Sequence, residues 1–385
     1  MDVSRVVNTH VHVPPNFSAF ATPEAVIAAA VAAGVVALGV SNFFDQRVYA
    51  RIGELAAGTG VLPLYGVEFI TWVPEFEAAG VRVNDPANPG RMYVTGKAID
   101  PNRTPSPRAA RIAAQVRAAN DARAAVMVER VAAYLAGLGV PLQLDAGRMA
   151  AAVARRAGVP VEWVSLQERH IAAAVHAGLL GLPEGERAWD RIGARADITD
   201  PVAAQTAIRA RLLKAGTPGF APEVPLGFDD GYGYILDRGG IPCYPVLADG
   251  TDPVCPFEAD PAGLAEALLA RGIHAAELIP ARNHAAVVDA YSAALTAAGL
   301  IVLAGTEHNT PETIPLDPAC TDGPLSAAAR QAVWEGTCVV VAHAARVARG
   351  APGFVDAAGR PATPRDELIA EGNTALLAAA KRHEN

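Results

Sequence analysis

Short apolar runs that follow helical patterns recur along this chain, and this repeat constrains the fold more than any other feature. Several runs begin just after a glycine that ends the helical pattern, as at Gly34, Gly272 and Gly299. Seven runs are interpreted as buried strands: 5–13, 35–40, 62–70, 240–247, 275–280, 300–305 and 338–343. Repeated strand–helix units with nearly continuous apolar strands predict a parallel sheet with helices on both faces.

Two helix starts support this interpretation. Thr22 and Asp260 each precede a proline, which is the pattern of an N-cap residue followed by proline at the first helical position. Connections between parallel strands are then expected to be right-handed.

Residues 100–225 interrupt the repeat, because helical patterns follow one another there without a convincing strand. We therefore expect a large helical insertion after the third strand, covering the barrel mouth. The expected organisation is a first barrel part in residues 1–99, the insertion in 100–225, and a second barrel part with a C-terminal helix in 226–385. The predicted fold is a distorted α/β barrel, and a doubly wound open sheet is the alternative.

Composition narrows the class of protein. A formal net charge of -8 argues against a nucleic-acid partner. The four cysteines form no C-x-x-C pair, and no apolar segment is long enough to span a bilayer. With no signal-peptide pattern at the start, we expect a cytoplasmic protein that binds a small molecule, with a homo-oligomer as an open option.

The segment NTHVH at the start of the chain points to a metal site. His10 and His12 lie two residues apart, so in a strand their imidazoles share one face. Burying both rings without a ligand would cost desolvation energy, although a hydrogen-bonded pair at a barrel mouth is the simpler alternative. Glu68, Glu307 and His343 lie at or near other predicted strand ends, where sites in such folds form. This mixed set of ligands suits zinc, manganese or iron.

Three motifs resemble those of the PHP domain, the polymerase and histidinol phosphatase superfamily. NTHVH resembles its opening His-x-His motif, GVEF its strand-three glutamate, and GTEHN its Gly-Ser-Asp-x-His segment. The resemblance extends over residues 6–76 and 240–355. It implies a distorted barrel of seven β/α units, a cluster of up to three metal ions and hydrolysis of phosphate esters.

The chain departs from the PHP pattern at two places. Residues 41–43 read Ser-Asn-Phe where most members have Thr-Asp-His, and Asp45 is out of register to replace the missing ligand. In GTEHN, Glu307 and Asn309 stand at the aspartate and histidine positions, unless His308 turns inward. These changes predict one or two metal ions instead of three.

Other polar residues are candidates for substrate binding and proton transfer. Arg282, Asn283 and Asn309 are expected to bind substrate, and a guanidinium at position 282 could hold a phosphate or carboxylate through two hydrogen bonds. The alternative for Arg282 is an ion pair with a loop carboxylate. His170, His308 and Asp249 are the candidate catalytic residues. His170 could instead cap or pack the insertion, and Asp249 could belong to an ordinary turn.

The sequence therefore predicts a metal-dependent hydrolase, with a phosphoesterase acting on a small phosphorylated metabolite as the leading hypothesis. The expected substrate is anionic, and the expected cofactor is one or two divalent transition-metal ions. One alternative is a mononuclear metal enzyme that acts on a polyhydroxylated or amide substrate. The other is a barrel that binds a ligand without catalysis.

Overall fold

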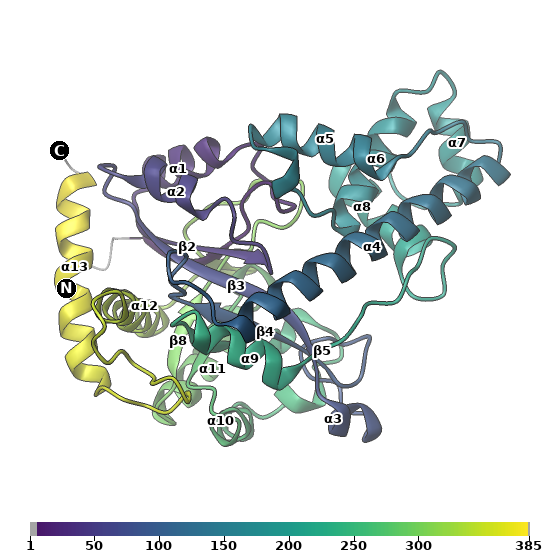
Figure 1. Ribbon diagram of the computed structural model, residues 1–385. Helices are drawn as coiled ribbons and strands as arrows, with labels where there is room; N and C mark the ends of the chain where they lie inside the picture. The colour runs from purple at the N-terminus through teal and green to yellow at the C-terminus, as the bar shows by residue number, and fades with distance from the viewer. Residues whose placement is uncertain (1–5, 384–385) are drawn as a thin grey trace.

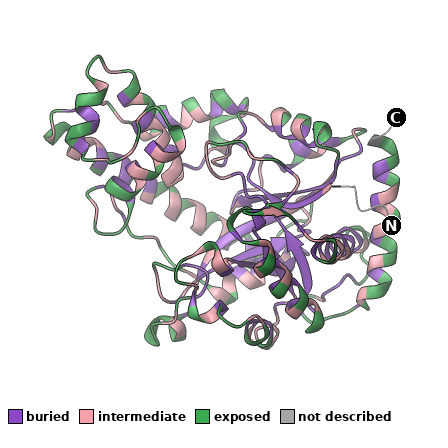
Figure 2. Ribbon diagram, turned by 180° about the vertical axis from the view of Figure 1, so that it is seen from behind, coloured by how far each residue is buried: buried purple, intermediate pink, exposed green. Residues whose placement is uncertain are grey.

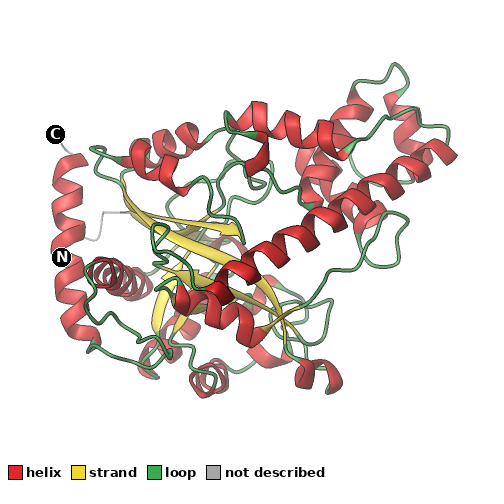
Figure 3. Cartoon of the chain, in the orientation of Figure 1, coloured by secondary structure: helices red, strands yellow, loops and turns green. Residues whose placement is uncertain are grey.

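The computed structural model describes residues 6–383, and its centre is a barrel-like sheet (Figure 3). The strands lie in the order β1 (Val6–Val11), β2 (Val35–Phe43), β3 (Leu62–Trp72), β4 (Arg91–Lys97), β6 (Ile241–Val246), β7 (Ala275–Leu278) and β8 (Ile301–Ala304). β4 is antiparallel to β3 and β6, and the other neighbours along this path are parallel. The short β5 (Leu226–Gly227) pairs with the end of β3, while β9 (Ala319–Cys320) and β10 (Gly323–Pro324) form a separate hairpin.

The segment after β8 brings the barrel close to closure. The carbonyl of His10 accepts hydrogen bonds from the N–H groups of Thr306 at 3.1 Å and Glu307 at 2.8 Å. The N–H of His12 in turn donates to the carbonyl of Glu307 at 2.8 Å. The first and last strands of the sheet are therefore joined at the level of the two histidines.

Helices surround this sheet (Figure 1). They are α1 (Pro23–Ala32), α2 (Tyr49–Ala56), α3 (Pro74–Ala78), α9 (Phe228–Asp237), α10 (Pro261–Ala270), α11 (Ala285–Ala297), α12 (Ala327–Ala348) and α13 (Arg365–His383). The two expected N-caps are confirmed, since Thr22 accepts from the N–H of Ala25 and Asp260 accepts from those of Ala262 and Gly263. Within residues 6–383, no helix combines the length and apolar character needed to cross a membrane.

Six of the seven predicted strands are confirmed, although Arg5 lies outside the described residues. The strand predicted at 338–343 is wrong, because this run is the middle of α12. It is apolar on every side because α12 lies between β8 and α13. A Cβ on Gly336 would lie 2.1 Å from the carbonyl oxygen of Val302, and one on Gly372 would lie 2.0 Å from that of Cys338. A helix buried on all sides produces the same apolar run as a buried strand.

The long insertion is helical, as expected, but it follows β4 and not the third strand. It contains α4 (Pro107–Gly137), α5 (Ala146–Ala157), α6 (Glu168–Leu180), α7 (Gly185–Ile192) and α8 (Pro201–Ile208), which continues as a π-helical turn over Arg209–Leu213. These helices extend to one side of the barrel (Figure 1) and have their own buried face (Figure 2). Their apolar cluster includes Met127, Val131, Leu135, Ile171, Leu179, Ile192 and Ile208, separate from the barrel core.

Candidate metal centre

The strands β1 and β3, which lie on either side of β2, bring His10, His12 and Glu68 together. His10 lies in β1 and His12 just after it, and Glu68 lies in β3. The Nε2 atoms of His10 and His12 lie 3.5 Å and 3.2 Å from Oε2 of Glu68. One possible ligand atom from each residue lies within 4.8 Å of the others, so a single ion could contact all three side chains.

The hydrogen bonding of these three residues fits a cation. His10 Nε2, His12 Nδ1 and Glu68 Oε2 are buried, and none has a hydrogen-bond partner. Such buried orphan atoms are uncommon, because an unpaired polar group costs free energy. Two imidazoles and a carboxylate are a usual ligand set for zinc and related transition metals. The arrangement therefore suits a metal ion, as the sequence predicted for these residues.

Glu277 of β7 orients His10 from behind. Its carboxylate oxygen accepts a hydrogen bond from His10 Nδ1 at 2.6 Å, and both of its oxygens lie 2.7 Å from Nζ of Lys97 in β4. Burial alone would raise the pKa of Glu277, but Lys97 and His10 lower it to about 2. The ionised carboxylate can only accept, so Nδ1 of His10 carries the hydrogen and Nε2 presents its lone pair to the metal position.

The electrostatic field at this position favours positive charge. Burial disfavours a charged imidazole, yet the Glu277 carboxylate raises the pKa of His10 to about 9. Burial would likewise raise the pKa of Glu68, but the adjacent His10 and His12 imidazoles hold it well below its ordinary value. An environment that stabilises a proton on His10 also stabilises a metal cation in the proton's place.

A cavity opens directly above this cluster, with about 650 Å³ of space between its walls. His12 and Glu68 form part of its floor. Its other lining residues are Phe17, Phe43, Ile70, Asn120, Arg123, Gln167, Glu168, Arg169, Glu223 and Asn309. Since Asn120 and Arg123 belong to α4 and Glu168 and Arg169 to α6, the insertion forms one wall of the cavity over the barrel mouth.

Glu307, predicted as a metal ligand, points away from the three-residue cluster. Its carboxylate forms an ion pair with Arg282 and accepts from Nδ2 of Asn309 at 2.8 Å. Arg282 therefore has the loop-carboxylate partner that was the alternative to an anion clamp, and it does not line the cavity. Asn309 does line the cavity, and its Oδ1 accepts from Nη2 of Arg169 at 3.4 Å.

His343, also predicted as a ligand, is not brought to the cluster. It lies in α12, where Nε2 bonds to the carbonyl of Gly239 and Nδ1 accepts from the N–H of Phe354, each at 2.8 Å. Both ring nitrogens are thus occupied by backbone groups. The prediction depended on a strand at 338–343, and this run is part of α12 instead.

The two histidines predicted to transfer protons have structural partners instead. His308 bonds through Nδ1 to Oγ1 of Thr306 and through Nε2 to the carbonyl of Ile314, and its ring stacks on Phe20. Nδ1 of His170 accepts from the N–H of Gln167 and caps the start of α6, which was the alternative role for this residue. Neither histidine lines the metal cavity.

Asp249 and Asn283 connect two loops beside the barrel mouth. The Asp249 carboxylate accepts from Nδ2 of Asn283 at 2.8 Å and lies 2.7 Å from Nδ1 of His284. Asn283 also donates to the carbonyl of Leu247 at 2.7 Å. Neither residue lines the metal cavity, so the structure gives them a role in joining the segments after β6 and β7.

The departure from the PHP pattern after β2 has a clear structural consequence. Oδ1 of Asn42 accepts from the N–H of Val13 at 2.8 Å, and Phe43 places an aromatic ring on the cavity wall. Asp45 is paired with Arg47 and Arg117 at 2.5 Å and 2.9 Å and offers no free carboxylate. Among residues 6–383, the only group of three or more potential ligands is His10, His12 and Glu68. This set favours one metal ion.

Several residues around the centre were missed from the sequence. Lys97 and Glu277 are buried charges within apolar strands, and such a charge inside an apolar run is the signal that could have revealed them. Arg123, Arg169 and Glu223 line the cavity from the insertion. They lie among many other charged residues on helices and loops, so no local pattern distinguishes them.

No family model matches this sequence, and no curated protein matches it either. A solved structure from Bifidobacterium adolescentis, of a protein proposed to be a metal-dependent phosphoesterase, is similar with a TM-score of 0.59 and 15% identity, covering 86% of this chain and 96% of its own. An amidohydrolase from Chromobacterium violaceum, solved with bound sulfate and no metal, has a TM-score of 0.55 and 18% identity, covering 82% and 93%. At these identities the likeness supports the barrel fold alone.

Proposed function

We propose that this protein is a metal-dependent hydrolase, and that it is a phosphoesterase acting on a small phosphorylated metabolite. The observation that carries the proposal is the set of three buried ligand atoms without partners at the floor of a cavity with arginines in its wall. The resemblance to PHP-domain motifs supports phosphate-ester hydrolysis. So does the name given to the similar Bifidobacterium protein.

In this proposal His10, His12 and Glu68 hold the ion, and Glu277 orients His10. A bound divalent transition metal supplies a nucleophile at neutral pH and polarises a phosphoryl oxygen. Glu68 is ionised, and the hydrogen bond from His10 Nδ1 to Glu277 keeps Nε2 directed at the ion. The protein residues thereby fix where the reacting phosphoryl group lies.

Arg169 is the best candidate for binding the anionic group of the substrate. It lines the cavity and donates to the neutral Asn309 at 3.4 Å, and no carboxylate among residues 6–383 forms an ion pair with it. Burial lowers the pKa of Arg169 to about 10, which still leaves the guanidinium charged at neutral pH. The other arginine of the wall, Arg123, lies 3.3 Å from Glu223 and donates to the carbonyl of Ala221.

The test combines metal analysis with a substrate screen. The purified protein is loaded with zinc, manganese or iron(II) and assayed for phosphate release from a panel of sugar, nucleotide and polyol phosphates. We expect release that requires metal and is lost in His12→Ala together with the metal. Full metal loading without phosphate release from any member of the panel would overturn the phosphoesterase assignment.

A second candidate reaction is hydrolysis of an amide at a mononuclear centre. It is favoured by the single three-ligand group and by Phe43 at a position where the PHP pattern has a ligand histidine. The same metal-loaded protein, assayed for amine release from N-acyl substrates, distinguishes this reaction from phosphate-ester hydrolysis. If the protein takes up none of the three metals, the result would instead support a role in binding a ligand without catalysis.

A further inference from the structure

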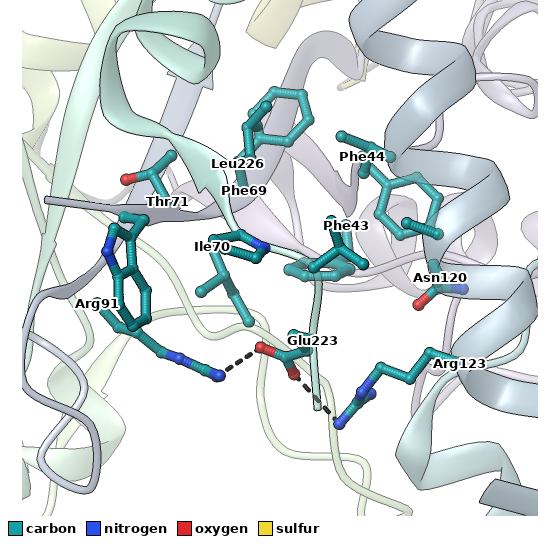
Figure 4. Close-up of a pocket in the computed structure, with 15 residues that line it drawn as sticks. Phe43, Phe44, Phe69, Ile70, Thr71, Arg91, Asn120, Arg123, Glu223 and Leu226 are labelled. Carbon is teal, nitrogen blue, oxygen red and sulfur yellow. Dashed lines mark hydrogen bonds and ion pairs between the residues drawn. The ribbon is translucent and has the colours of Figure 1, made fainter. Parts of the chain in front are cut away.

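A second cavity, drawn in Figure 4, shares part of its lining with the cavity above His12 and Glu68. It lies between β3, α4 and the segment that leads into β5, with about 690 Å³ between its walls. Five residues line both cavities: Phe43, Ile70, Asn120, Arg123 and Glu223. A molecule whose reacting group lies beside Glu68 could therefore extend into the second cavity without leaving the protein.

The lining of the second cavity is predominantly apolar. Phe43, Phe44, Phe69, Ile70, Trp72, Val116 and Leu226 supply most of its walls. In Figure 4 the Phe43 and Ile70 side chains lie above the carboxylate of Glu223, and all three residues line both cavities. Aromatic and branched side chains at this density favour a ring or a branched alkyl group through area burial and ring contacts.

The polar groups in this cavity are already engaged by the protein. Thr71 Oγ1 donates to the carbonyl of Met92 at 2.7 Å, and Asn120 Nδ2 donates to that of Leu166 at 3.0 Å. Glu223 lies 2.5 Å from Nη1 of Arg91 and 3.3 Å from Nη2 of Arg123. A polar ligand group entering here would lose its water and find few free partners, whereas an apolar group loses nothing.

Phe43 links this cavity to the departure from the PHP pattern. At the position where that pattern carries a ligand histidine, this chain places a ring that faces both cavities. The same replacement that removes a metal ligand thus supplies an apolar wall next to the remaining ligands.

We propose, on the basis of the hydrolase function above, that the cavity lined by Phe43, Phe69, Trp72 and Leu226 is the subsite for an apolar part of the substrate. The substrate class is an anionic ester or amide in which a phenyl-sized ring or branched alkyl group lies next to the group that is hydrolysed. Arg91, Glu223 and Arg123 form the charged edge between this apolar part and the reacting group.

The experiment uses a matched pair of non-hydrolysable anions, phenylphosphonate and methylphosphonate, titrated into the metal-loaded protein by calorimetry. We expect phenylphosphonate to bind at least tenfold more tightly, since burial of a ring of this size contributes on that order. Equal affinity of the two phosphonates would overturn the subsite.

Two neighbouring alanines of α4 provide the variant and its control. Ala119 lines the apolar cavity, whereas Ala118 is exposed and does not. Ala119→Trp should fill the cavity and abolish the preference for phenylphosphonate, while Ala118→Trp should keep it. A preference that survives in Ala119→Trp overturns the proposal. If Ala119→Trp does not fold, Leu226→Ala provides a second test. Leu226 lines the apolar cavity alone, so its removal should weaken phenylphosphonate severalfold and leave methylphosphonate unchanged.

A neutral probe separates failure of the subsite from failure of the proposed reaction. Benzyl alcohol carries the ring without an anionic group, and its binding is followed by ligand-observed NMR. Binding to wild type and to Ala118→Trp but not to Ala119→Trp supports the subsite even if neither phosphonate binds, and in that case the phosphoesterase assignment alone falls. Benzyl alcohol binding that is the same in both tryptophan variants overturns the subsite whatever the reaction proves to be.

Discussion

The Nδ1 atom of His10 lies 2.6 Å from a carboxylate oxygen of Glu277, and this contact connects β1 to β7 across the barrel. Both residues are buried, and the same carboxylate also receives the Lys97 ammonium and the Thr9 hydroxyl. Glu277 therefore fixes the position and the tautomer of His10 without lying among the ligands themselves. A metal ion bound by His10 would therefore be held by the barrel core.

Replacing the carboxylate of Glu277 should weaken metal binding while leaving the three ligands in place. We expect Glu277→Gln to lower metal affinity by about 10- to 100-fold, the usual effect of losing a carboxylate that orients a ligand histidine. Competition with a chromogenic chelator measures the change. Asp249→Asn is the control, since this carboxylate lies outside the cavity, and an affinity loss of the same size in both variants would contradict the role given to Glu277.

The buried pair of Lys97 and Glu277 also makes a prediction about stability. Their side chains are 3% and 0% exposed, so removing one charge leaves the other buried and uncompensated. Glu277→Gln should lower the free energy of unfolding by about 3–5 kcal/mol, and adding Lys97→Met should restore much of it. Urea unfolding of the two variants and wild type tests this, and a double variant less stable than the single one would contradict it.

The barrel could be predicted from the sequence because its strands are short apolar runs with helix caps and glycines at fixed places. Thr22, Asp260 and Gly34 signal helix boundaries through local chemistry. β4 was missed because it is antiparallel and follows only the five-residue α3 and a loop, so it breaks the repeat. The run 338–343 was misassigned because complete burial hides helical periodicity.

The candidate metal ligands also differ in how far the sequence could place them. His10 and His12 could be predicted because two residues of one strand necessarily share a face. Glu68 was placed correctly because its strand was. His343 was misplaced together with the run 338–343. Glu307 does follow a predicted strand, but the direction of a side chain after a strand depends on the turn. Glu307 has φ of 58° and faces Arg282. No sequence pattern specifies that turn.

Removing His12 should separate true ligands from other buried histidines. We expect His12→Ala to lose most of its metal, whereas His343→Ala should keep a wild-type metal content, since both His343 nitrogens bond to the backbone. Elemental analysis after dialysis against metal-free buffer measures both. Wild-type metal content in His12→Ala would remove His12 from the ligand set, and loss in a folded His343→Ala would place that residue among the ligands.

The two arginines near Asn309 should differ in their effects on catalysis. Arg169→Ala should reduce kcat/KM by about one to two decades, because a charge-assisted hydrogen bond to the substrate contributes roughly 1.5–3 kcal/mol. Arg282→Lys should have a smaller effect, since lysine can still neutralise Glu307. Steady-state kinetics on a substrate found in the screen decides between them, and a larger loss in Arg282→Lys would move the anion site to the end of β7.

Glu258 should make the stability of the protein depend on pH below neutrality. This residue is fully buried, and burial raises its pKa from 4.5 to about 7 despite hydrogen bonds from the Tyr244 hydroxyl and the Leu247 and Ala248 N–H groups. The folded state holds this proton more tightly than the unfolded state, so the protonated Glu258 contributes to the free energy of unfolding. This contribution is fully present below about pH 4.5 and is lost as pH rises to about 7. The loss corresponds to about 3 kcal/mol over that interval.

The variant Glu258→Gln cannot titrate at this position. The free energy of unfolding of wild type should therefore fall relative to that of the variant between pH 5 and 7, and the two should run parallel above pH 8. Urea unfolding at pH 5, 6, 7 and 8 measures this difference, and a constant difference across all four values would show that Glu258 is already ionised in the folded protein at pH 5.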